Sequence, residues 1–515
     1  MKYIIPLLAL AAFLYACKKT ETVAVVDKAQ RFSEVHRPQF HFSPPQMWMN
    51  DPNGMVYHKG EYHLFYQYYP DSNVWGPMHW GHAISKDLIR WEHQPIALYP
   101  DSLGMIFSGG AVVDKNNSSG LGTADNPPLI AIYTSHNAEM EKQGRNDYQT
   151  QSLAYSVDDG RTWTKYENNP VIKNPGYRDF RDPKFFWHEE SKKWILVLVA
   201  GDHAQIFGSK DLKSWNKLSD FGKEYGSHGG VWECPDLFPL TVDGENMRKW
   251  IMIININPGG PNGGSATQYF VGDFDGEKFV CDTDKSITSW LDYGPDNYAG
   301  VTWSNAPDNK TIFIGWMSNW AYGLSVPTSP WRSANTLPRE LKLARVNGSL
   351  HVRSELWDGV GTLSKTSKQF AKLSIQDSTD VSGEIGFPIT QSLLRGEIEA
   401  KDFSFVFSNS LGQKVKVGFD SKSKQFFIDR KKSGKTSFSS DFVKDITAPR
   451  IGANSKLKFT IVMDVSSMEV FFDDGLTVLT ALFFPEEDLS QLKIYSPAGV
   501  INVDSLTVSQ LSSIW

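Results

Sequence analysis

A short turn motif that recurs along the first 300 residues constrains the fold more than any other feature. Ser85-Lys86-Asp87-Leu88-Ile89-Arg90-Trp91 returns as Ser209-Lys210-Asp211-Leu212-Lys213-Ser214-Trp215, and a looser copy spans Ser156 to Trp163. In each copy the Ser and Asp side chains can close a turn through backbone bonds, and the Trp begins the next strand. Residues 272–276 are a candidate fourth copy. The copies are roughly 50 to 70 residues apart, which is enough for one four-stranded sheet with its loops.

The segments between these turns have the composition of short β-strands. Residues 61–68, 193–199 and 250–254 are rich in aromatic and β-branched residues and are bounded by turn-forming residues. No amphipathic helical pattern longer than about ten residues stands out among them. Repeated sheets predict a β-propeller, and about 300 residues at roughly 60 per blade gives about five blades. We therefore predict an all-β chain with a five-bladed β-propeller at residues 38–353.

The composition changes after about residue 350, where Trp becomes rare and Lys and Ser become more frequent. Alternating apolar and polar residues in short segments such as 403–407 are typical of a β-sandwich. We predict a linker at residues 354–368 and a β-sandwich domain at residues 369–515. Its expected role is to pack against the propeller and support it.

The N-terminus predicts export. Lys2 precedes an apolar run that ends at Ala16, and this run is shorter than the roughly 20 residues of a membrane-spanning helix. Because Leu14-Tyr15-Ala16-Cys17 resembles a bacterial lipobox, residues 1–17 are expected to be a lipoprotein-type signal peptide. Cys17 would then be acylated and hold the protein on a bacterial membrane, periplasmic or at the cell surface, with residues 18–37 as a tether. The alternative is a secreted chain cleaved near Ala16.

The composition also bears on ligands. The net charge of −6 provides no basic surface for nucleic acid. The 17 Trp residues suit carbohydrate, whose rings present apolar faces to aromatic side chains, although cores can also be rich in Trp. Cys234 and Cys281 could form a disulfide, but two buried thiols are the reading we favour. His79 and His82 lack the helix and the Cys partners of a metal site, and no metal or other cofactor is predicted.

Three acidic residues lie in short, constrained stretches. Asp51 lies in Trp48-Met49-Asn50-Asp51-Pro52-Asn53-Gly54, Asp182 in Phe180-Arg181-Asp182-Pro183, and Glu233 in Trp232-Glu233-Cys234-Pro235. Each acid has aromatic neighbours and a Pro within two residues, and Pro fixes φ and removes a backbone donor. A single Asp-Pro is more often only a turn. Three such acids on different blades predict a shared site, because the innermost strands of all blades converge on the propeller axis.

Clustered carboxylates repel one another, so at least one pKa is expected to be raised until that group holds a proton near neutral pH. Arg181 is expected to keep its neighbour Asp182 ionised. One ionised and one protonated carboxyl are what cleavage of a glycosidic bond requires, and a separation of about 5 Å would mean retention of configuration.

These stretches, together with Phe107-Ser108-Gly109, resemble the signature blocks of glycoside hydrolase family 32, the β-fructofuranosidases. That family includes invertases, inulinases, levanases and fructosyltransferases. The resemblance runs from about Pro38 to the C-terminus and implies a five-bladed propeller followed by a β-sandwich. It implies that Asp51 is the nucleophile, Glu233 the general acid/base and Asp182 the stabiliser of the transition state.

The resemblance also implies a fructose-binding subsite. The matching positions are Asn50, Gln67, Trp75, Phe107, Ser108, Arg181 and Trp320. The stretch from Asp292 to Ala299 is a further family-like block, expected on the pocket wall.

The function implied by the resemblance is that of an exported, retaining β-fructosidase that hydrolyses terminal fructosyl units of fructans or sucrose. Related alternatives are endo-cleavage of levan or inulin and fructosyl transfer to another sugar. An alternative from a different class is a non-catalytic fructan-binding lipoprotein that keeps the fold. The preference for β-2,1 or β-2,6 linkages depends on loops around the pocket rim and is left open.

Overall fold

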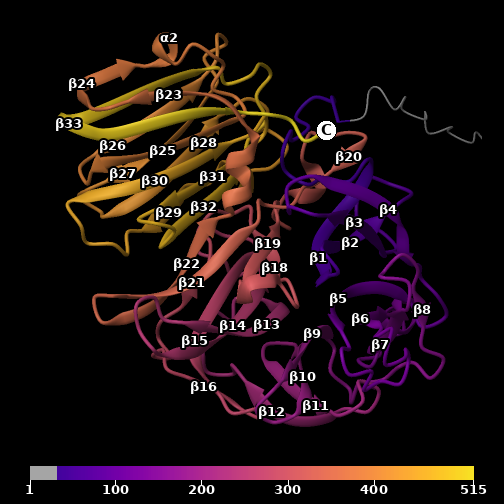
Figure 1. Cartoon of the computed structure of the whole chain (residues 1–515). Helices are drawn as coiled ribbons and strands as arrows, with labels where there is room; N and C mark the ends of the chain where they lie inside the picture. The colour runs from indigo at the N-terminus through magenta and orange to yellow at the C-terminus, as the bar shows by residue number, and fades with distance from the viewer. Residues whose placement is uncertain (1–31) are drawn as a thin grey trace, which may run out of the picture.

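The computed structural model describes residues 32–515, and these consist almost entirely of β-strands (Figure 1). The first part is a ring of five sheets, the blades of a β-propeller, and the last part is a β-sandwich beside the ring. The predicted fold is therefore confirmed. No helix within residues 32–515 is long and apolar enough to cross a membrane.

The blades, numbered I to V here, are built from strands that follow one another along the chain. Blade I consists of β1 (Met47–His58), β2 (Glu61–Tyr69), β3 (His79–Ser85) and β4 (Trp91–Leu98). Blade II consists of β5 (Met105–Val113), β6 (Leu129–His136), β7 (Gln149–Ser156) and β8 (Thr164–Lys165), with helix α1 (Ala138–Lys142) between β6 and β7. Blade III consists of β9 (Phe180–His188), β10 (Lys193–Ala200), β11 (Ala204–Ser209) and β12 (Asn216–Phe221).

Blade IV consists of β13 (Val231–Thr241), β14 (Arg248–Asn257), β15 (Ala266–Phe274), β16 (Phe279–Cys281) and β17 (Ser289–Trp290), of which β17 pairs with β15. Blade V consists of β18 (Tyr298–Thr302), β19 (Ile312–Trp316), β21 (Arg339–Val346) and β22 (Ser349–Leu356), with the 3-10 helices η2 (Pro307–Asn309) and η3 (Gly323–Ser325) in its loops. The first strands of the blades contact one another around the axis, so they are the innermost strands.

The ring is closed by a strand that lies between β19 and β21 in the sequence. This strand, β20 (Trp331–Arg332), pairs in parallel with the start of β1, where Met47 is opposite Trp331. The backbone amide of Met47 also donates to the carbonyl of Pro330 at 2.8 Å. Blade V and blade I are thus joined by backbone hydrogen bonds as well as by packing.

The recurring turn motif connects the third and fourth strands of a blade. In blade I the Ser85 hydroxyl accepts from the amide of Leu88 at 2.8 Å, and in blade III Ser209 accepts from Leu212 at 2.9 Å. Both Leu residues have a positive φ, 67° and 61°. The candidate fourth copy occupies the same place in blade IV, where the Asp275 carboxylate caps the turn between β15 and β16. These bonds confirm the predicted turn, which forms from residues close in sequence.

The C-terminal domain is an antiparallel β-sandwich around one apolar core. Its longest strand, β33, is the last in the chain, and it pairs with the first four strands of the domain and ties the sheet together. The elements are η4 (Asp358–Leu363), β23 (Ser364–Phe370), β24 (Leu373–Asp380), α2 (Ser382–Ile385), β25 (Ser392–Glu399), β26 (Phe403–Ser408), β27 (Lys414–Asp420), β28 (Gln425–Lys432), η5 (Asp441–Val443), β29 (Ile446–Pro449), β30 (Lys456–Met463), β31 (Ser467–Phe472), β32 (Thr477–Leu482) and β33 (Gln491–Leu511).

The domain boundaries differ from the predicted ones at both ends of the propeller. The last propeller strand ends at Leu356 and β23 begins at Ser364, so the predicted linker of 354–368 includes the ends of two strands. The predicted tether of 18–37 is wrong for residues 32–37. There Arg37 is fully buried, with its guanidinium over the rings of Phe32 and Trp331 at 4.8 and 4.3 Å. The signal peptide, Cys17 and the rest of the tether lie outside the described residues.

Buried charges join the sandwich to the propeller. Arg339 on β21 binds Asp292 at 2.8 Å and Glu469 on β31 at 2.6 Å, and all three side chains are fully buried. A second buried pair joins Asp296 to Arg430 on β28 at 2.6 Å. Asp292 also accepts from the amide and the hydroxyl of Thr480 on β32, at 3.0 and 2.6 Å. Both aspartates therefore bind the sandwich, and the prediction that their block lies on the pocket wall is wrong for these two residues.

Candidate active site

A cavity of about 390 Å³ opens at one end of the propeller axis. It is lined by residues from the innermost strands β1, β5, β9 and β13 and from loops around them. All ten residues predicted from the sequence line this one cavity, namely Asn50, Asp51, Gln67, Trp75, Phe107, Ser108, Arg181, Asp182, Glu233 and Trp320. They are up to 270 residues apart in the sequence, so only closure of the ring brings them together.

The innermost strands lose their regular pairing at the level of this cavity. The register shifts on β1 after Met49, on β5 after Ile106, and on β13 after Glu233. The same occurs on β9 after Arg181 and on β18 after Tyr298. Such β-bulges bend a strand and redirect its side chains, and they place these functional groups at the mouth of the axis.

The local backbone at two of these bulges is unusual. Asp182 has φ of 62° and Cys234 has φ of 41°, a region that non-glycine residues seldom adopt. Backbone of this kind persists only where the surrounding structure fixes it, and it clusters at functional sites. Gly54, after the first acid, has φ of 52°, and a side chain there would collide with Phe65 and Trp80.

The Asp51 carboxylate is held by hydrogen-bond donors on both oxygens. Ser108 donates to Oδ2 at 2.6 Å, and the Asn50 amide donates to Oδ1 at 3.0 Å. Asn50 is in turn held by the Trp48 indole, which donates to its amide oxygen at 2.7 Å. Burial and the charge of Glu233 raise the pKa of Asp51, while the donors from Ser108 and Asn50 act in the opposite direction. The side chain is therefore fixed in one orientation at the base of the cavity.

Asp182 and Asp51 meet at Cys234. The backbone amide of Cys234 donates to Asp182 Oδ2 at 3.0 Å, and its thiol lies 3.7 Å from that oxygen and 3.5 Å from Asp51 Oδ2. Burial raises the pKa of Asp182 to about 7, and the charges of Glu233 and Asp51 add to this increase against the opposing effect of Arg181. Near pH 7 this carboxyl is therefore only partly ionised, because burial opposes the effect of the guanidinium, whose Nε lies 3.7 Å from Asp182 Oδ2.

The thiols themselves are free. Cys234 is buried as predicted, whereas Cys281 is only half-buried, and the two form no disulfide. The His82 ring nitrogen lies 3.1 Å from that of His63 in the interior of blade I. Among residues 32–515, no group of three or more His, Cys, Asp or Glu side chains could hold a metal ion.

Glu233 is held by one cation and one phenol. Arg181 donates to Glu233 Oε1 at 2.9 Å, and the Tyr298 hydroxyl donates to Oε2. Arg181 also binds Asp179 at 2.5 Å, so its guanidinium joins two acids on the cavity wall. Because Glu233 and Cys234 are consecutive, the contact of Cys234 with the two aspartates brings all three carboxyls to one place. This arrangement can supply a nucleophile and a proton donor at the same bond.

Aromatic side chains form much of the remaining wall of the cavity. Phe107 stacks on His136 with a centroid distance of 4.3 Å, and Trp75 meets the edge of Phe107 at 6.2 Å. Trp320 packs on Trp316 at 4.9 Å. These rings give the cavity apolar faces beside its hydrogen-bonding groups, as a sugar ring requires.

Two family models match the chain over nearly its whole described length. Residues 41–354 match the glycosyl hydrolases family 32 N-terminal domain, and residues 355–510 match the family 32 C-terminal domain.

The chain belongs to glycosyl hydrolase family 32.

Several relatives in family 32 match nearly the whole chain. The levanase of Bacillus subtilis is 49% identical over 94% of this chain and 72% of its own length. An extracellular exo-inulinase of Aspergillus niger is 41% identical over 96% of this chain and 98% of its own length. Among solved structures, the exo-inulinase of Aspergillus awamori superposes with a TM-score of 0.86 at 37% identity, covering 94% of this chain and 100% of that one. The β-fructofuranosidase of Schwanniomyces occidentalis, complexed with fructosyl-erythritol, gives a TM-score of 0.83 at 32% identity, covering 95% and 100%.

The family 32 cavity also contains residues that sequence reasoning missed. They are His136, Glu141, Tyr148, Gln149, Asp179 and Leu324, and Tyr298 contacts the site through Glu233. Glu141 comes from helix α1, which projects between β6 and β7, and its carboxylate lies 3.1 Å from His136 Nε2. Two of these residues could have been found from the sequence. Tyr298 lies in the family-like block that starts at Asp292, and Asp179 lies two residues before Arg181. The others depend on how the loop around α1 folds.

Proposed function

We propose that this family 32 chain is an exported, retaining β-fructofuranosidase that releases terminal fructose from fructans or sucrose. The observation that carries the proposal is the meeting of Asp51, Asp182 and Glu233 around Cys234, in a cavity with aromatic walls. The levanase, exo-inulinase and β-fructofuranosidase similarities point to the same substrate class.

In the first step, Asp51 attacks the anomeric carbon of the fructosyl unit and Glu233 gives its proton to the leaving oxygen. The bond between that carbon and the leaving sugar breaks as a covalent bond to Asp51 forms. Asp51 suits the nucleophile because Ser108 and Asn50 hold it rigidly and favour its anionic form. Glu233 suits the acid/base because Arg181 and Tyr298 fix its two oxygens in place.

In the second step, Glu233 takes a proton from a water molecule, which attacks the same carbon and releases Asp51 as a carboxylate. Two displacements at one carbon give net retention of configuration. Asp182 holds the sugar hydroxyls in place while positive charge develops on the ring in both transition states. Its fixed position comes from the amide of Cys234 and from the Thr134 hydroxyl, which accepts from the amide of Asp182 at 2.9 Å.

Attack at a chain end is supported by the shape of the axis. Behind the active site the space narrows to a void of about 10 Å³, lined by Pro52, Cys234 and Lys184 among others. A fructan chain cannot thread through such a constriction, so the active site is a dead-end cavity, a shape that suits a terminal unit better than an internal one. We therefore favour exo-hydrolysis over the endo-acting alternative.

We expect fructose to be the sole early product from inulin and levan when the full chain is incubated in parallel with sucrose, inulin and levan. For sucrose, glucose should be released in equal amount. Chromatography of early time points gives the products, and NMR of the first-formed fructose anomer gives the stereochemistry, which should be retained. Early oligosaccharides from a polymer would instead support endo-cleavage, longer products from sucrose would support fructosyl transfer, and no release from any substrate would support a non-catalytic binding protein.

We expect kcat/KM for sucrose to fall as the pH rises through about 7. Burial and the charges of Glu233 and Asp51 raise the pKa of Asp182 to about 7. Above that pH Asp182 ionises fully, so its carboxyl can accept from sugar hydroxyls but can no longer donate to them. In Asp182→Asn this titrating group is absent, so the limb near pH 7 should be lost from the residual activity. A limb that stays in place would contradict the assignment to Asp182.

Anchoring by Cys17 is the second part of the proposal and rests on the lipobox-like Leu14-Tyr15-Ala16-Cys17. In a bacterial host, the wild-type chain should partition with membranes and incorporate labelled fatty acid, whereas Cys17→Ser should do neither. Activity per protein should be equal in both, since residue 17 lies far outside the cavity in sequence. Wild-type protein found only in the soluble fraction would contradict the anchor and leave an ordinary secreted enzyme.

A further inference from the structure

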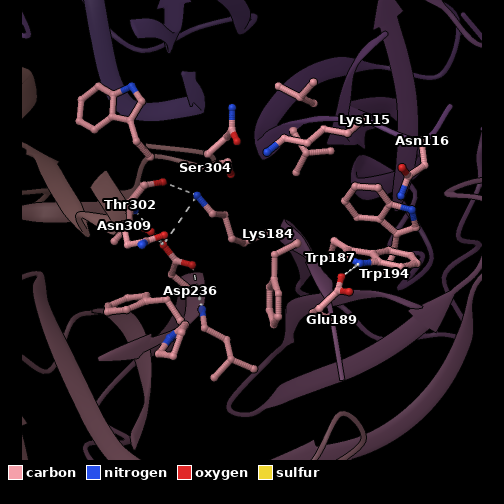
Figure 2. Close-up of a pocket in the computed structure, with 18 residues that line it drawn as sticks. Lys115, Asn116, Lys184, Trp187, Glu189, Trp194, Asp236, Thr302, Ser304 and Asn309 are labelled. Carbon is pink, nitrogen blue, oxygen red and sulfur yellow. Dashed lines mark hydrogen bonds and ion pairs between the residues drawn. The ribbon is translucent and has the colours of Figure 1, made fainter. Parts of the chain in front are cut away.

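A second cavity of about 680 Å³ lies on the propeller and is larger than the active site (Figure 2). Its lining comes from the far ends of the innermost strands β5, β9, β13 and β18 and from the loops that follow them. Lys184 lines both this cavity and the small axial void, and Asp182 lines both that void and the active site. The two cavities therefore lie at opposite ends of one axis. The volume of the second cavity is within the roughly 300–1,000 Å³ that small-ligand sites occupy.

One wall of this far cavity is aromatic. Phe186 and Trp187 on β9 are half-buried, and Phe238 on β13 completes the apolar surface. The Trp187 indole donates to Glu189 at 2.6 Å, which holds the ring in one orientation at the opening (Figure 2). A half-exposed, fixed aromatic face beside a polar rim is the surface on which a sugar ring stacks.

The rim also carries hydrogen-bonding groups that the protein itself does not use. The side chains of Lys115, Asn116 and Asn309 line the cavity, and none forms a hydrogen bond or ion pair with another residue in the range 32–515. The ammonium of Lys115 is directed into the cavity in Figure 2. These groups can donate to and accept from ligand hydroxyls without breaking an existing contact.

The charges at the base of the cavity are already paired. The Lys184 ammonium donates to the Thr302 carbonyl and lies 3.7 Å from Asp236, and both charged side chains are buried. Asp236 also accepts from the amide and the hydroxyl of Thr302, each at 2.7 Å. The base of the cavity therefore has no unpaired cation for a phosphate or carboxylate, and the Lys115 ammonium at the rim is exposed, where water screens its charge. A neutral, hydroxyl-rich ligand fits better than an anion.

We propose that this far cavity is a second saccharide-binding site, which holds a segment of a fructan chain away from the active site. The identity of the saccharide rests on the proposed function, because the fructan that the active site would shorten is the neutral saccharide that this protein would encounter. The axial void of about 10 Å³ separates the two sites, so one chain can occupy both only by passing around the outside of the propeller. Binding at the far cavity then raises the local concentration of chain ends, an effect that needs long chains and is absent for sucrose.

The test is Trp187→Ala, made in the full chain and also in an Asp51→Ala background that does not degrade the polymer. In native gels containing levan or inulin, we expect the Trp187 variant to lose about five- to tenfold in affinity relative to its Asp51→Ala parent. In the active enzyme, KM for the polymer should rise by a similar factor, while kcat and KM for sucrose stay unchanged.

The double variant Lys115→Ala/Asn116→Ala serves if Trp187→Ala folds poorly, because both residues are exposed and have no partner among the described residues. Tyr495→Ala, an aromatic that is 38% exposed on the sandwich and lines neither cavity, is the matched control and should change nothing. Unchanged polymer affinity in both far-cavity variants would overturn the proposal, as would an equal loss on sucrose, which would place the effect in the fold. Absence of fructose release by the wild type would refute the proposed function, whereas the gel assay would still measure the far site.

Discussion

Replacing Asp51 with asparagine is expected to lower kcat for both sucrose and fructan by at least about a thousandfold. Asparagine keeps the size of the side chain, so Ser108 and Asn50 remain in place around it. The amide is a poor nucleophile, however, and no other described carboxyl occupies the same position. Steady-state kinetics with purified protein, with folding checked by circular dichroism, measures the loss.

Glu233→Gln should lose a similar factor on sucrose but differ from Asp51→Asn in one respect. With a fructoside whose leaving group needs no protonation, the Glu233 variant should recover much of its first step, because Asp51 can still attack. Asp51→Asn should recover nothing. Asp147→Asn, an exposed carboxylate on the loop after α1, is the control and should turn over normally. Near-normal turnover by Asp51→Asn would exclude Asp51 as the nucleophile.

The second large effect is expected at the domain interface, where Glu469→Gln should lower the free energy of unfolding by about 3–5 kcal/mol. Glu469 accepts from Arg339 and from His41, and all three side chains are fully buried. Burial alone would lower the pKa of His41, but hydrogen bonds from its ring to Asp464 and Glu469 raise it to about 9. Two cations therefore face Glu469 at neutral pH. The neutral glutamine side chain of the variant would leave part of their charge without a carboxylate partner.

Urea unfolding followed by tryptophan fluorescence measures this change, because most tryptophans belong to the propeller. The exposed pair of Arg345 and Glu245 provides the matched control, since Glu245→Gln removes the same kind of contact at the surface. Solvent screens that pair, so no measurable loss is expected there. Equal effects of the two substitutions would mean that the buried network does not hold the domains together.

The parts of the fold that the sequence predicts are those encoded by neighbours. The turn at Ser85 and Asp87 forms from bonds within five residues, so its recurrence revealed the blades without knowledge of their packing. The three acids were visible for a similar reason, since each lies in a stretch whose Pro and aromatic neighbours restrict it locally.

What the sequence could not reveal depends on partners far away along the chain. Asp292 and Asp296 lie in the same family-like block as Tyr298. The two aspartates bind Arg339 and Arg430, whereas Tyr298 donates to Glu233 in the active site. No feature of the local sequence distinguishes these roles. The raised pKa of Asp182 was likewise not predicted for that residue. The neighbour Arg181 is visible in the sequence, whereas burial by the other blades is not.

The pairing of β20 with β1 places the proposed nucleophile at the seam of the ring. Asp51 lies on the first described strand, but that strand gains its second partner only when Trp331 and Arg332 have been synthesised. A chain truncated before Trp331 would contain all three acids, but its propeller ring would not be closed. The active site is thus complete only after the fifth blade closes on the first. For an exported chain, activity therefore begins only after nearly the whole propeller has been exported and has folded.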